Sequence, residues 1–294
     1  MRLASYRRSL ARAKSIPSGS HRKRHALREV AARNAQKTRV LTVGLKSPAG
    51  HDLPCRLHVP QKDGVFPGVL MLPGGLAGAD ALEGPTSVIT PQCFARHGFA
   101  AMSVTPSGRE GAPGQENWNG RDQQQEVVSA LRMLVAHPLV DEQNIQVVSI
   151  SFGLVLGLGA LNCSPDLAAQ VRGFIDWEGP GHRRWFAGLE KSGFRSDPQF
   201  WKNREGVHLI KALKCPYYRL QSLHDHVHGD NAEIGLEMVR AATREGVSIV
   251  ALNGNTNPSD WGSPDVLLSP KLSVQRDAIL LWANLLRSDS CNKL

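Results

Sequence analysis

Ser151 stands in the stretch with the clearest chemical potential, NIQVVSISFGLVLGLGALN at residues 144–162. The pattern predicts a short buried strand, a tight turn at Ser151-Phe152-Gly153, and then a helix of small and aliphatic residues. A strand-to-helix turn of this kind lifts the serine hydroxyl out of the sheet, beside the first N–H groups of the helix. The sequence therefore predicts Ser151 as the nucleophile of an acyl-transfer reaction.

The motif around this serine is SISFG, residues 149–153, whereas the usual form of the turn is G-x-S-x-G. Serine at the first position is nearly small enough for the same close packing of strand and helix. Acyl transfer also needs N–H donors for the oxyanion of the tetrahedral intermediate. The candidate donors are Phe152 and the loop after the apolar strand at residues 69–72, namely Gly74, Gly75 and Leu76.

Acids and histidines that could complete this chemistry follow two later strand patterns, at residues 171–179 and 215–230. A neutral imidazole suits a general base at neutral pH, and a neighbouring carboxylate orients it and stabilises its charged form. The candidate bases are His226 and His228, with His224 and His182 behind them. The candidate acids are Asp225, Asp176 and Glu178. Trp177 and Glu178 are also candidates for contacts with the substrate.

Short strands alternate with helices along most of the chain. Residues 39–61 predict a hairpin with its turn at 47–52, and residues 69–72 and 98–106 predict buried strands. Apolar positions with a period near 3.6 predict a helix from Asp122 to Val135. The order predicts an α/β fold with a mostly parallel central sheet, helices on both faces and a short cap at residues 180–212.

This order resembles the α/β-hydrolase fold, nearest to its dienelactone-hydrolase-like and prolyl-oligopeptidase-like branches of esterases and peptidases. The resemblance covers residues 40–288 and rests on the PGG loop, the VDEQNIQVVSISFG segment and the SLHDHV loop after residues 217–220. It implies that Ser151 is the nucleophile, that Phe152 and the PGG loop form the oxyanion hole, and that Asp225 is the acid.

The resemblance also implies a histidine after the last strand, where NGNTNPSDWG at residues 253–262 contains none. Three interpretations stay open. A histidine from another loop has taken over as base, His226 or His228 first. Alternatively, Asn255 or Asn257 fills the position, and the chain is an inactive relative that binds a small ligand or a partner. In the third interpretation, His224, His226 and His228 hold the ion of a metal-dependent hydrolase.

An aromatic and basic segment at residues 183–201 falls within the expected cap. It could shape an acyl pocket, or it could receive an anionic substrate through Arg183 and Arg184. A cap packed by its own aromatic side chains, with solvated arginines, is an equal alternative.

Length and composition fit one globular domain, because 294 residues with 41% hydrophobic side chains can bury a large core. No run of about 18 apolar residues occurs, which excludes a membrane-spanning helix by sequence. The five cysteines are scattered and form no C-x-x-C pair, so we expect reduced thiols in a cytoplasmic compartment and no disulfide or zinc framework.

The net charge of +9 belongs to one end of the chain. Residues 1–39 contain twelve Lys or Arg and a single acid, whereas the rest contains 23 bases and 25 acids. We therefore expect a basic, disordered extension at residues 1–38, a folded domain at 39–290, and no binding of nucleic acid by that domain. An organellar transit peptide is the less favoured interpretation of the extension.

The sequence as a whole predicts a serine-dependent hydrolase of ester or related acyl bonds that works through an acyl-enzyme on Ser151. Its expected partner is a small-molecule acyl substrate. We expect no cofactor, no bound metal and no membrane association, and the sequence leaves a homo-oligomer open.

Overall fold

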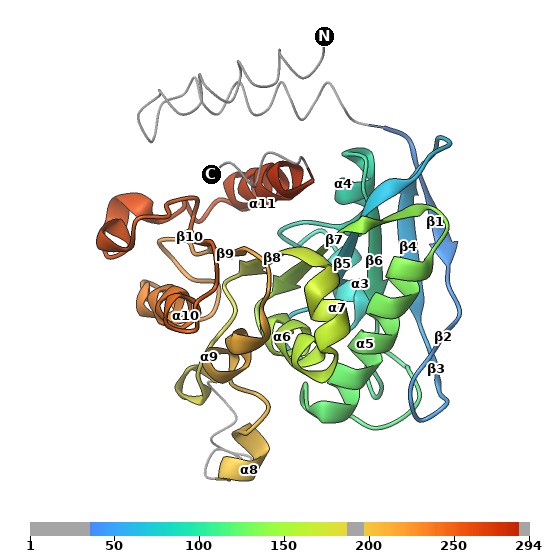
Figure 1. Ribbon diagram of the computed structural model, residues 1–294, viewed down its shortest axis with the longest axis horizontal. Coiled ribbons are helices and arrows are strands. Elements are labelled where there is room, and N and C mark those ends of the chain that lie inside the picture. The colour runs from blue at the N-terminus through green and yellow to red at the C-terminus, as the bar shows by residue number, and fades with distance from the viewer. Residues whose placement is uncertain (1–35, 187–196, 288–294) are drawn as a thin grey trace.

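The computed structural model describes residues 36–186 and 197–287. Its centre is an eight-stranded sheet in the order β1-β4-β6-β5-β7-β8-β9-β10 (Figure 1). Neighbours from β6 through β10 run parallel, whereas β1 and β6 both pair antiparallel with β4. The strands are β1 (Thr38–Thr42), β4 (Cys55–Pro60), β5 (Phe66–Leu72), β6 (Ala100–Val104), β7 (Val140–Ile150), β8 (Val171–Trp177), β9 (Tyr217–Leu220) and β10 (Val250–Leu252).

The first two sheet strands form the predicted hairpin. Thr38 lies opposite Pro60, and Thr42 lies opposite Arg56. At its far end, the short strands β2 (Leu45–Lys46) and β3 (Asp52–Leu53) pair in a second, two-stranded sheet. A surface ion pair of 2.7 Å between Lys46 and Asp52 lies across the turn.

Helices cover both faces of the large sheet, as the alternation of the side chains requires. On β5, Leu70 and Leu72 face a core built with α5, α6, α7 and α10, whereas Val69 and Met71 face a second core built with α3, α4 and α11. The helices are α3 (Ala79–Glu83), α4 (Pro91–Arg96), α5 (Arg121–Ala136), α6 (Gly153–Cys163), α7 (Pro165–Gln170), α10 (Glu233–Arg244) and α11 (Leu272–Leu286). The predicted mostly parallel sheet with helices on both faces is confirmed.

Short helical turns complete the described chain. They are η1 (Arg183–Trp185), α8 (Pro198–Trp201), α9 (Gly206–Leu209), η4 (Ile210–Ala212), η5 (Pro258–Asp260) and η6 (Pro264–Val266). Four of them lie within the expected cap, of which residues 187–196 lie outside the described residues. Residues 1–35 of the expected basic extension also lie outside them.

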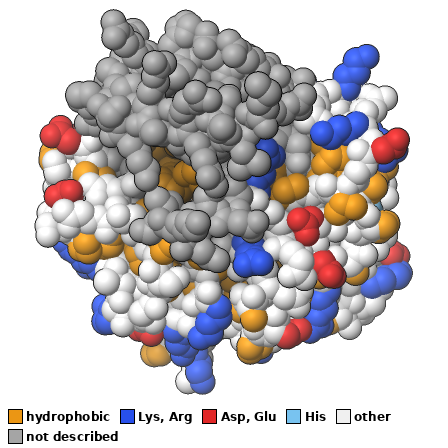
Figure 2. All heavy atoms as spheres, turned by 45° about the horizontal axis from the view of Figure 1, so that its top comes forward, with side chains coloured by type: hydrophobic (Ala, Val, Ile, Leu, Met, Phe, Trp, Pro, Cys, Tyr) orange, Lys and Arg blue, Asp and Glu red, His pale blue; other side chains and the backbone are white. Residues whose placement is uncertain are grey.

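The described surface mixes charges of both signs. On the face drawn in Figure 2, Lys and Arg side chains lie interspersed with Asp and Glu side chains. Within residues 36–186 and 197–287, no helix combines the length and the apolar character that crossing a membrane would require.

Candidate active site

Ser151 lies at the turn between β7 and α6, with a positive φ of 51°. This left-handed conformation is uncommon for a residue with a side chain, so the surrounding packing must hold it. The N–H of Ser151 donates to the carbonyl of Trp177 across 2.8 Å. A Cβ at Gly153 would lie 2.6 Å from the carbonyl oxygen of Pro73, which explains the glycine two residues after the serine. The predicted strand-turn-helix around Ser151 is therefore present.

Ser149 occupies the position where the usual motif has its first glycine. Its side chain is fully buried, and Oγ donates to Oδ1 of Asp176 across 3.3 Å. The parallel register of β7 and β8 places these two residues opposite each other. Ser149 thus belongs to the buried support below the turn.

Asp176, one of the predicted acids, is fully buried and has no contact with a described histidine. Its Oδ2 accepts hydrogen bonds from the Tyr217 hydroxyl across 2.6 Å and from Arg219 across 2.7 Å. Burial raises the pKa of the Asp176 carboxyl, although Arg219 and Tyr217 oppose that shift. The structure therefore corrects this prediction, because the carboxylate is part of a buried ion pair beneath the site.

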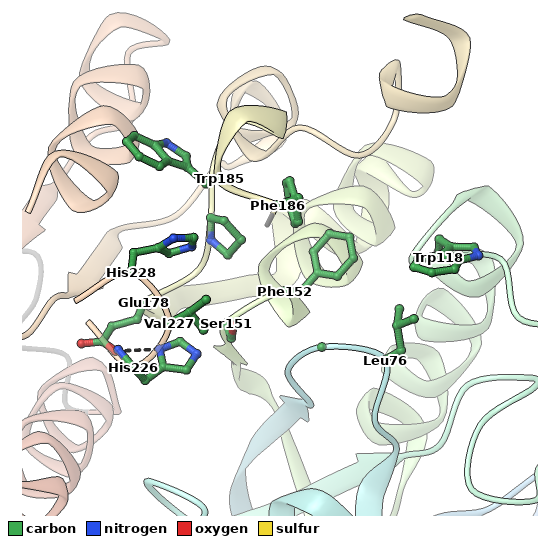
Figure 3. A pocket seen from close by; sticks show the side chains of 12 residues that line it. Leu76, Trp118, Ser151, Phe152, Glu178, Trp185, Phe186, His226, Val227 and His228 are labelled. Atoms are coloured by element: carbon green, nitrogen blue, oxygen red, sulfur yellow. Dashed lines mark hydrogen bonds and ion pairs between the residues drawn. The ribbon is translucent and has the colours of Figure 1, made fainter. Parts of the chain in front are cut away.

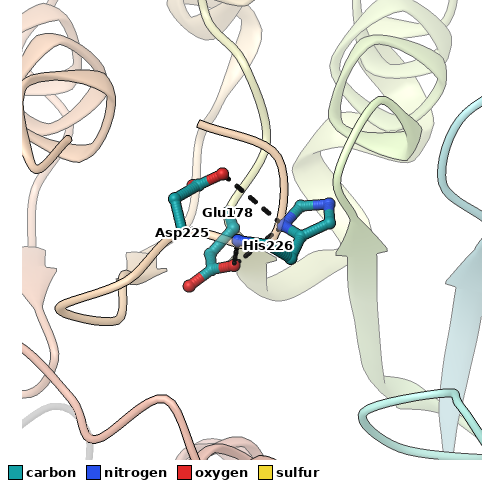
Figure 4. Close-up of side chains that lie close together, drawn as sticks. All are labelled: Glu178, Asp225 and His226. Carbon is teal, nitrogen blue, oxygen red and sulfur yellow. Dashed lines mark hydrogen bonds and ion pairs between the residues drawn. The ribbon is translucent and has the colours of Figure 1, made fainter. Parts of the chain in front are cut away.

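Glu178 and His226 meet at the carboxyl ends of β8 and β9 (Figure 4). Oε2 of Glu178 accepts from Nδ1 of His226 across 2.8 Å and from its backbone N–H across 3.1 Å. The imidazole also stacks on Trp177, with ring centroids 4.5 Å apart. The ring of His226 is thereby fixed in orientation, and Nε2 is the nitrogen left to accept a proton.

The Glu178 carboxylate has a second donor residue in Ser222. Oε1 accepts from the backbone N–H of Ser222 across 2.9 Å and from the Ser222 hydroxyl. Burial opposes ionisation, but the hydrogen bonds from His226 and Ser222 outweigh it and lower the pKa of Glu178. Glu178 is consequently a carboxylate at neutral pH, suited to stabilise a charged imidazole.

Asp225, the acid that the resemblance implies, lies farther from the same imidazole, with Oδ1 3.7 Å from Nδ1 of His226. Oδ1 accepts from the backbone N–H groups of Val227 and His228 across 2.9 and 3.0 Å. Oδ2 accepts from Nε2 of Gln221 across 2.9 Å. These contacts make Asp225 the carboxylate that shapes the turn carrying His226, while Glu178 makes the hydrogen bond to the ring.

The three histidines of the HDHVH segment have different partners. His224 is exposed and pairs with Asp230 across 2.8 Å, whereas His228 contacts the edge of Trp185 with centroids 5.9 Å apart. The described structure therefore does not assemble the cluster of His224, His226 and His228 that the metal alternative requires. Within the described chain, the group with metal-ligand spacing is Glu178, Asp225 and His226, whose ligand atoms lie within 4.8 Å of one another.

A pocket of about 240 Å³ opens above Ser151 (Figure 3). Seven of the predicted site residues line it: Gly75, Leu76, Ser151, Phe152, Glu178, His226 and His228. It is also lined by Trp118, Pro180, Trp185, Phe186 and Val227. Among the predicted residues, Gly74, Trp177, Asp176 and Asp225 do not line it. Figure 3 shows the second ring nitrogen of His226 turned from Glu178 toward the side where Ser151 lies.

The PGG loop packs directly against the serine. A Cβ at Gly74 would lie 3.0 Å from the Cβ of Ser151, so any larger residue would crowd the serine. Gly75 has a φ of +57°, which glycine adopts without strain. Within the described chain, the N–H groups of Gly75, Leu76 and Phe152 donate to no acceptor. These are three of the four residues, Gly74 being the other, that the sequence predicted as donors for an oxyanion.

Asn119, which sequence reasoning missed, holds the carbonyl of Phe152, the residue after Ser151. It is fully buried, and its Nδ2 donates to the carbonyl of Phe152 across 3.0 Å. Its Oδ1 accepts from Arg109 across 2.6 Å, and its N–H donates to Gln123 across 2.8 Å. No sequence signal marks this asparagine, because its partners come together only in the folded chain.

A buried polar chain under the His226 loop was also missed. Arg219 donates to Asp176 and, across 2.6 Å, to Oε1 of Gln221, and Gln221 in turn donates to Asp225. One signal for it stands in the sequence, since an arginine in the apolar strand YYRL needs a buried partner.

The loop after β10, where the resemblance implies a histidine, contains asparagines that make structural hydrogen bonds. Nδ2 of Asn253 donates to the carbonyls of Gln221 and Val266 across 2.7 and 2.9 Å, and its Oδ1 accepts from the Gln221 N–H across 2.9 Å. Asn255 donates to Asp260, and Asn257 caps η5. Neither Asn255 nor Asn257 lines the pocket.

Comparison with known proteins gives few matches in sequence and many in structure. No family model matches the chain. Over 123 residues the chain is 28% identical to an uncharacterised peptidase, YtmA, of Bacillus subtilis (strain 168). The match covers 42% of this chain and 45% of that protein, so the chain matches less than half the length of this relative.

Solved structures of similar shape include two enzymes of different length. An acylaminoacyl peptidase of Pyrococcus horikoshii superposes with a TM-score of 0.62 at 15% identity, covering 86% of this chain and 42% of the peptidase. A protein of Klebsiella pneumoniae assigned as a dienelactone hydrolase superposes with a TM-score of 0.57 at 13% identity. The superposition covers 85% of this chain and 99% of the Klebsiella protein. With the parallel sheet and the strained serine turn, these likenesses show that the chain has the α/β-hydrolase fold.

Proposed function

We propose that this chain is a serine hydrolase of ester or related acyl bonds, with Ser151 as nucleophile, His226 as base and Glu178 as the acid that orients the base. The observation that carries the proposal is the 2.8 Å hydrogen bond from Nδ1 of His226 to Glu178, with both residues lining the same pocket as Ser151. It supplies an activated imidazole although the loop after β10 has no histidine.

The first half of the reaction follows from this arrangement. In the neutral imidazole, the bond to Glu178 keeps the proton of His226 on Nδ1, so Nε2 can take the proton from Oγ of Ser151 as that oxygen attacks the carbonyl carbon. The Glu178 carboxylate stabilises the imidazolium that forms. The N–H groups of Phe152 and the PGG loop receive the negative charge on the carbonyl oxygen, a contribution of about 3 kcal/mol for each well-aimed donor.

The second half reverses the proton movements. His226 gives its proton to the leaving group, and the bond between the carbonyl carbon and the leaving group breaks, leaving an acyl-enzyme on Ser151. A water molecule then loses a proton to Nε2 as it attacks the acyl carbon. His226 returns this proton to Oγ of Ser151 as the bond between the acyl carbon and Oγ breaks, which releases the acid product and restores the serine hydroxyl.

The comparisons support the broad class of this proposal. YtmA is described as a peptidase, and the similar structures comprise peptidases, an esterase and a protein assigned as a dienelactone hydrolase. All of these activities break an acyl or related carbonyl bond. The bond type in this chain's substrate, ester or amide, is part of the proposal's test.

Labelling by a fluorophosphonate probe tests the assignment. Wild type should be labelled, whereas Ser151→Ala, His226→Ala and Glu178→Gln should label at most very slowly. His224→Ala is the matched control, because this exposed histidine pairs with Asp230 outside the pocket. Absence of labelling in folded wild type, or equal labelling of His226→Ala, would overturn the proposal.

The same assay separates the metal alternative. Treatment of wild type with EDTA should leave the labelling rate unchanged, since the proposed chemistry uses the Glu178–His226 pair without an ion. Loss of labelling on chelation, restored by Zn²⁺, would instead favour an ion held by Glu178, Asp225 and His226.

A further inference from the structure

If Ser151 and His226 act as proposed, the two sides of the pocket bind different portions of the substrate. His226 protonates the leaving group, so the leaving group departs on the His226 side of the serine. The acyl group must then lie on the opposite side. Figure 3 shows that four apolar side chains lie there: Leu76, Trp118, Phe152 and Phe186.

The walls of this acyl side are held in place by their own contacts. The rings of Phe152 and Phe186 are 4.5 Å apart, and Phe186 packs on Trp201 at 5.1 Å. The Trp118 carbonyl accepts from Nε of Arg204 across 3.0 Å, and its N–H donates to Glu116 across 2.6 Å. The subsite is therefore largely formed before a substrate arrives.

Among the described residues, the acyl side has no charged partner for a substrate. Glu178 is the one carboxylate in the described lining, and it is bound to His226, while that lining contains neither Lys nor Arg. The two arginines considered above as receivers of an anion pair with carboxylates outside the pocket lining, Arg183 with Glu205 across 3.9 Å and Arg184 with Glu237 across 3.0 Å. A charged acyl group would lose its hydration here without compensation from the described lining residues.

The size of the pocket fits a ring with a short linker. An apolar cavity of about 150 Å³ is enough to bind benzene, and the whole pocket, its His226 side included, has a volume of about 240 Å³. Aromatic walls add favourable edge and offset contacts with a ring beyond the burial of its surface. We propose, on the basis of the function proposed above, that this subsite selects an uncharged acyl group that ends in an aromatic ring.

Three 4-nitrophenyl esters with the same leaving group test this selectivity: the acetate, the 3-phenylpropanoate and the hemisuccinate. Each kcat/KM is first divided by the rate constant of the same ester with hydroxide, which corrects for intrinsic reactivity. The corrected kcat/KM should be about tenfold or more higher for the phenylpropanoate than for the acetate, because burying the ring stabilises the transition state by a corresponding free energy. The anionic hemisuccinate should be hydrolysed more slowly than the acetate.

Two variants locate the effect. Trp118→Ala and Leu76→Ala should each decrease the ratio of phenylpropanoate to acetate hydrolysis several-fold. Val65→Ala, at an exposed valine outside the pocket, is the control that should keep the ratio of wild type. Circular dichroism confirms that each variant is folded.

The outcomes separate this inference from the proposed function. Suppose that hydrolysis of the acetate depends on Ser151. A kcat/KM for the phenylpropanoate no higher than that for the acetate, or a preference for the hemisuccinate, then overturns the aromatic subsite and leaves the proposed function standing. If folded wild type hydrolyses none of the three esters through Ser151, the proposed function fails, and the subsite inference with it.

Discussion

The carboxylate of Glu178 accepts hydrogen bonds from both Nδ1 and the backbone N–H of His226. Glu178 follows β8 and His226 follows β9, whereas the α/β-hydrolase resemblance implies an acid after β9 and a base after β10. In the proposed triad, each of these two members has moved one strand earlier. The order of nucleophile, acid and histidine along the chain is nevertheless the one usual for the fold.

Exchanging the two acids in turn should distinguish their parts. Glu178→Gln removes the charge that stabilises the imidazolium, and we expect kcat to fall by about 10³–10⁴ with little change in KM. Asp225→Asn should cost at least tenfold less, because Asp225 mainly accepts from the turn and from Gln221. Steady-state hydrolysis of 4-nitrophenyl acetate measures both. A larger decrease in kcat for Asp225→Asn than for Glu178→Gln would indicate that Asp225 is the acid that acts on His226.

Asn119→Asp should impair the proposed oxyanion hole through the Phe152 peptide. An aspartate carboxylate cannot donate to the Phe152 carbonyl, as Nδ2 of Asn119 does. Without this bond we expect residue Phe152 to shift, and its N–H, on the other side of the same Cα, to lose its aim at the oxyanion. We expect a decrease of about ten- to a hundredfold in kcat, below the cost of deleting a donor outright, and a small change in KM. Asn284→Asp in α11 is the control, since it removes a similar amide-to-carbonyl bond far along the chain. Equal effects in both variants would argue against a positioning part for Asn119.

Gln221→Met should reduce the stability of the protein. It leaves a buried N–H of Arg219 and an oxygen of Asp225 without their partner, which costs about 1–3 kcal/mol of unfolding free energy. Urea unfolding measures the loss. Gln170→Met, at an exposed position in α7, should change stability by less than about 0.5 kcal/mol, so similar losses in both would contradict the assigned bonds.

Acid should destabilise the protein partly through Glu178. Despite burial, hydrogen bonds lower its folded-state pKa below the ordinary value of 4.5. Such a group contributes its full stabilisation above the unfolded pKa and loses it as pH falls through the folded pKa. Between about pH 5 and 3, the unfolding free energy of wild type should therefore fall more steeply than that of Glu178→Gln. Unfolding by urea at several pH values tests this, and parallel slopes would count against it.

The sequence predicted what depends on local pattern. The apolar run before Ser151 and the small residues after it predict the strand, the turn and the helix, because close packing there admits few alternatives. His226 and Glu178 were both candidates, but their pairing depends on β8 and β9 being neighbours in the sheet, with Trp177 opposite Leu220. Strand order is a property of the whole fold, so position along the chain alone does not predict the contact between Glu178 and His226.

The contact of Asn253 with Gln221 has a consequence for engineering. Residues 256–260 are exposed and line no part of the pocket, so foreign sequence can be spliced in there without removing a group that the proposed chemistry uses. Such an insertion should leave Asn253 intact, because its side chain hydrogen-bonds the backbone of Gln221 and so connects the end of β10 to the segment that leads to His226. A tag or a second domain inserted at residues 256–260, after Asn253, is therefore expected to leave the pocket intact.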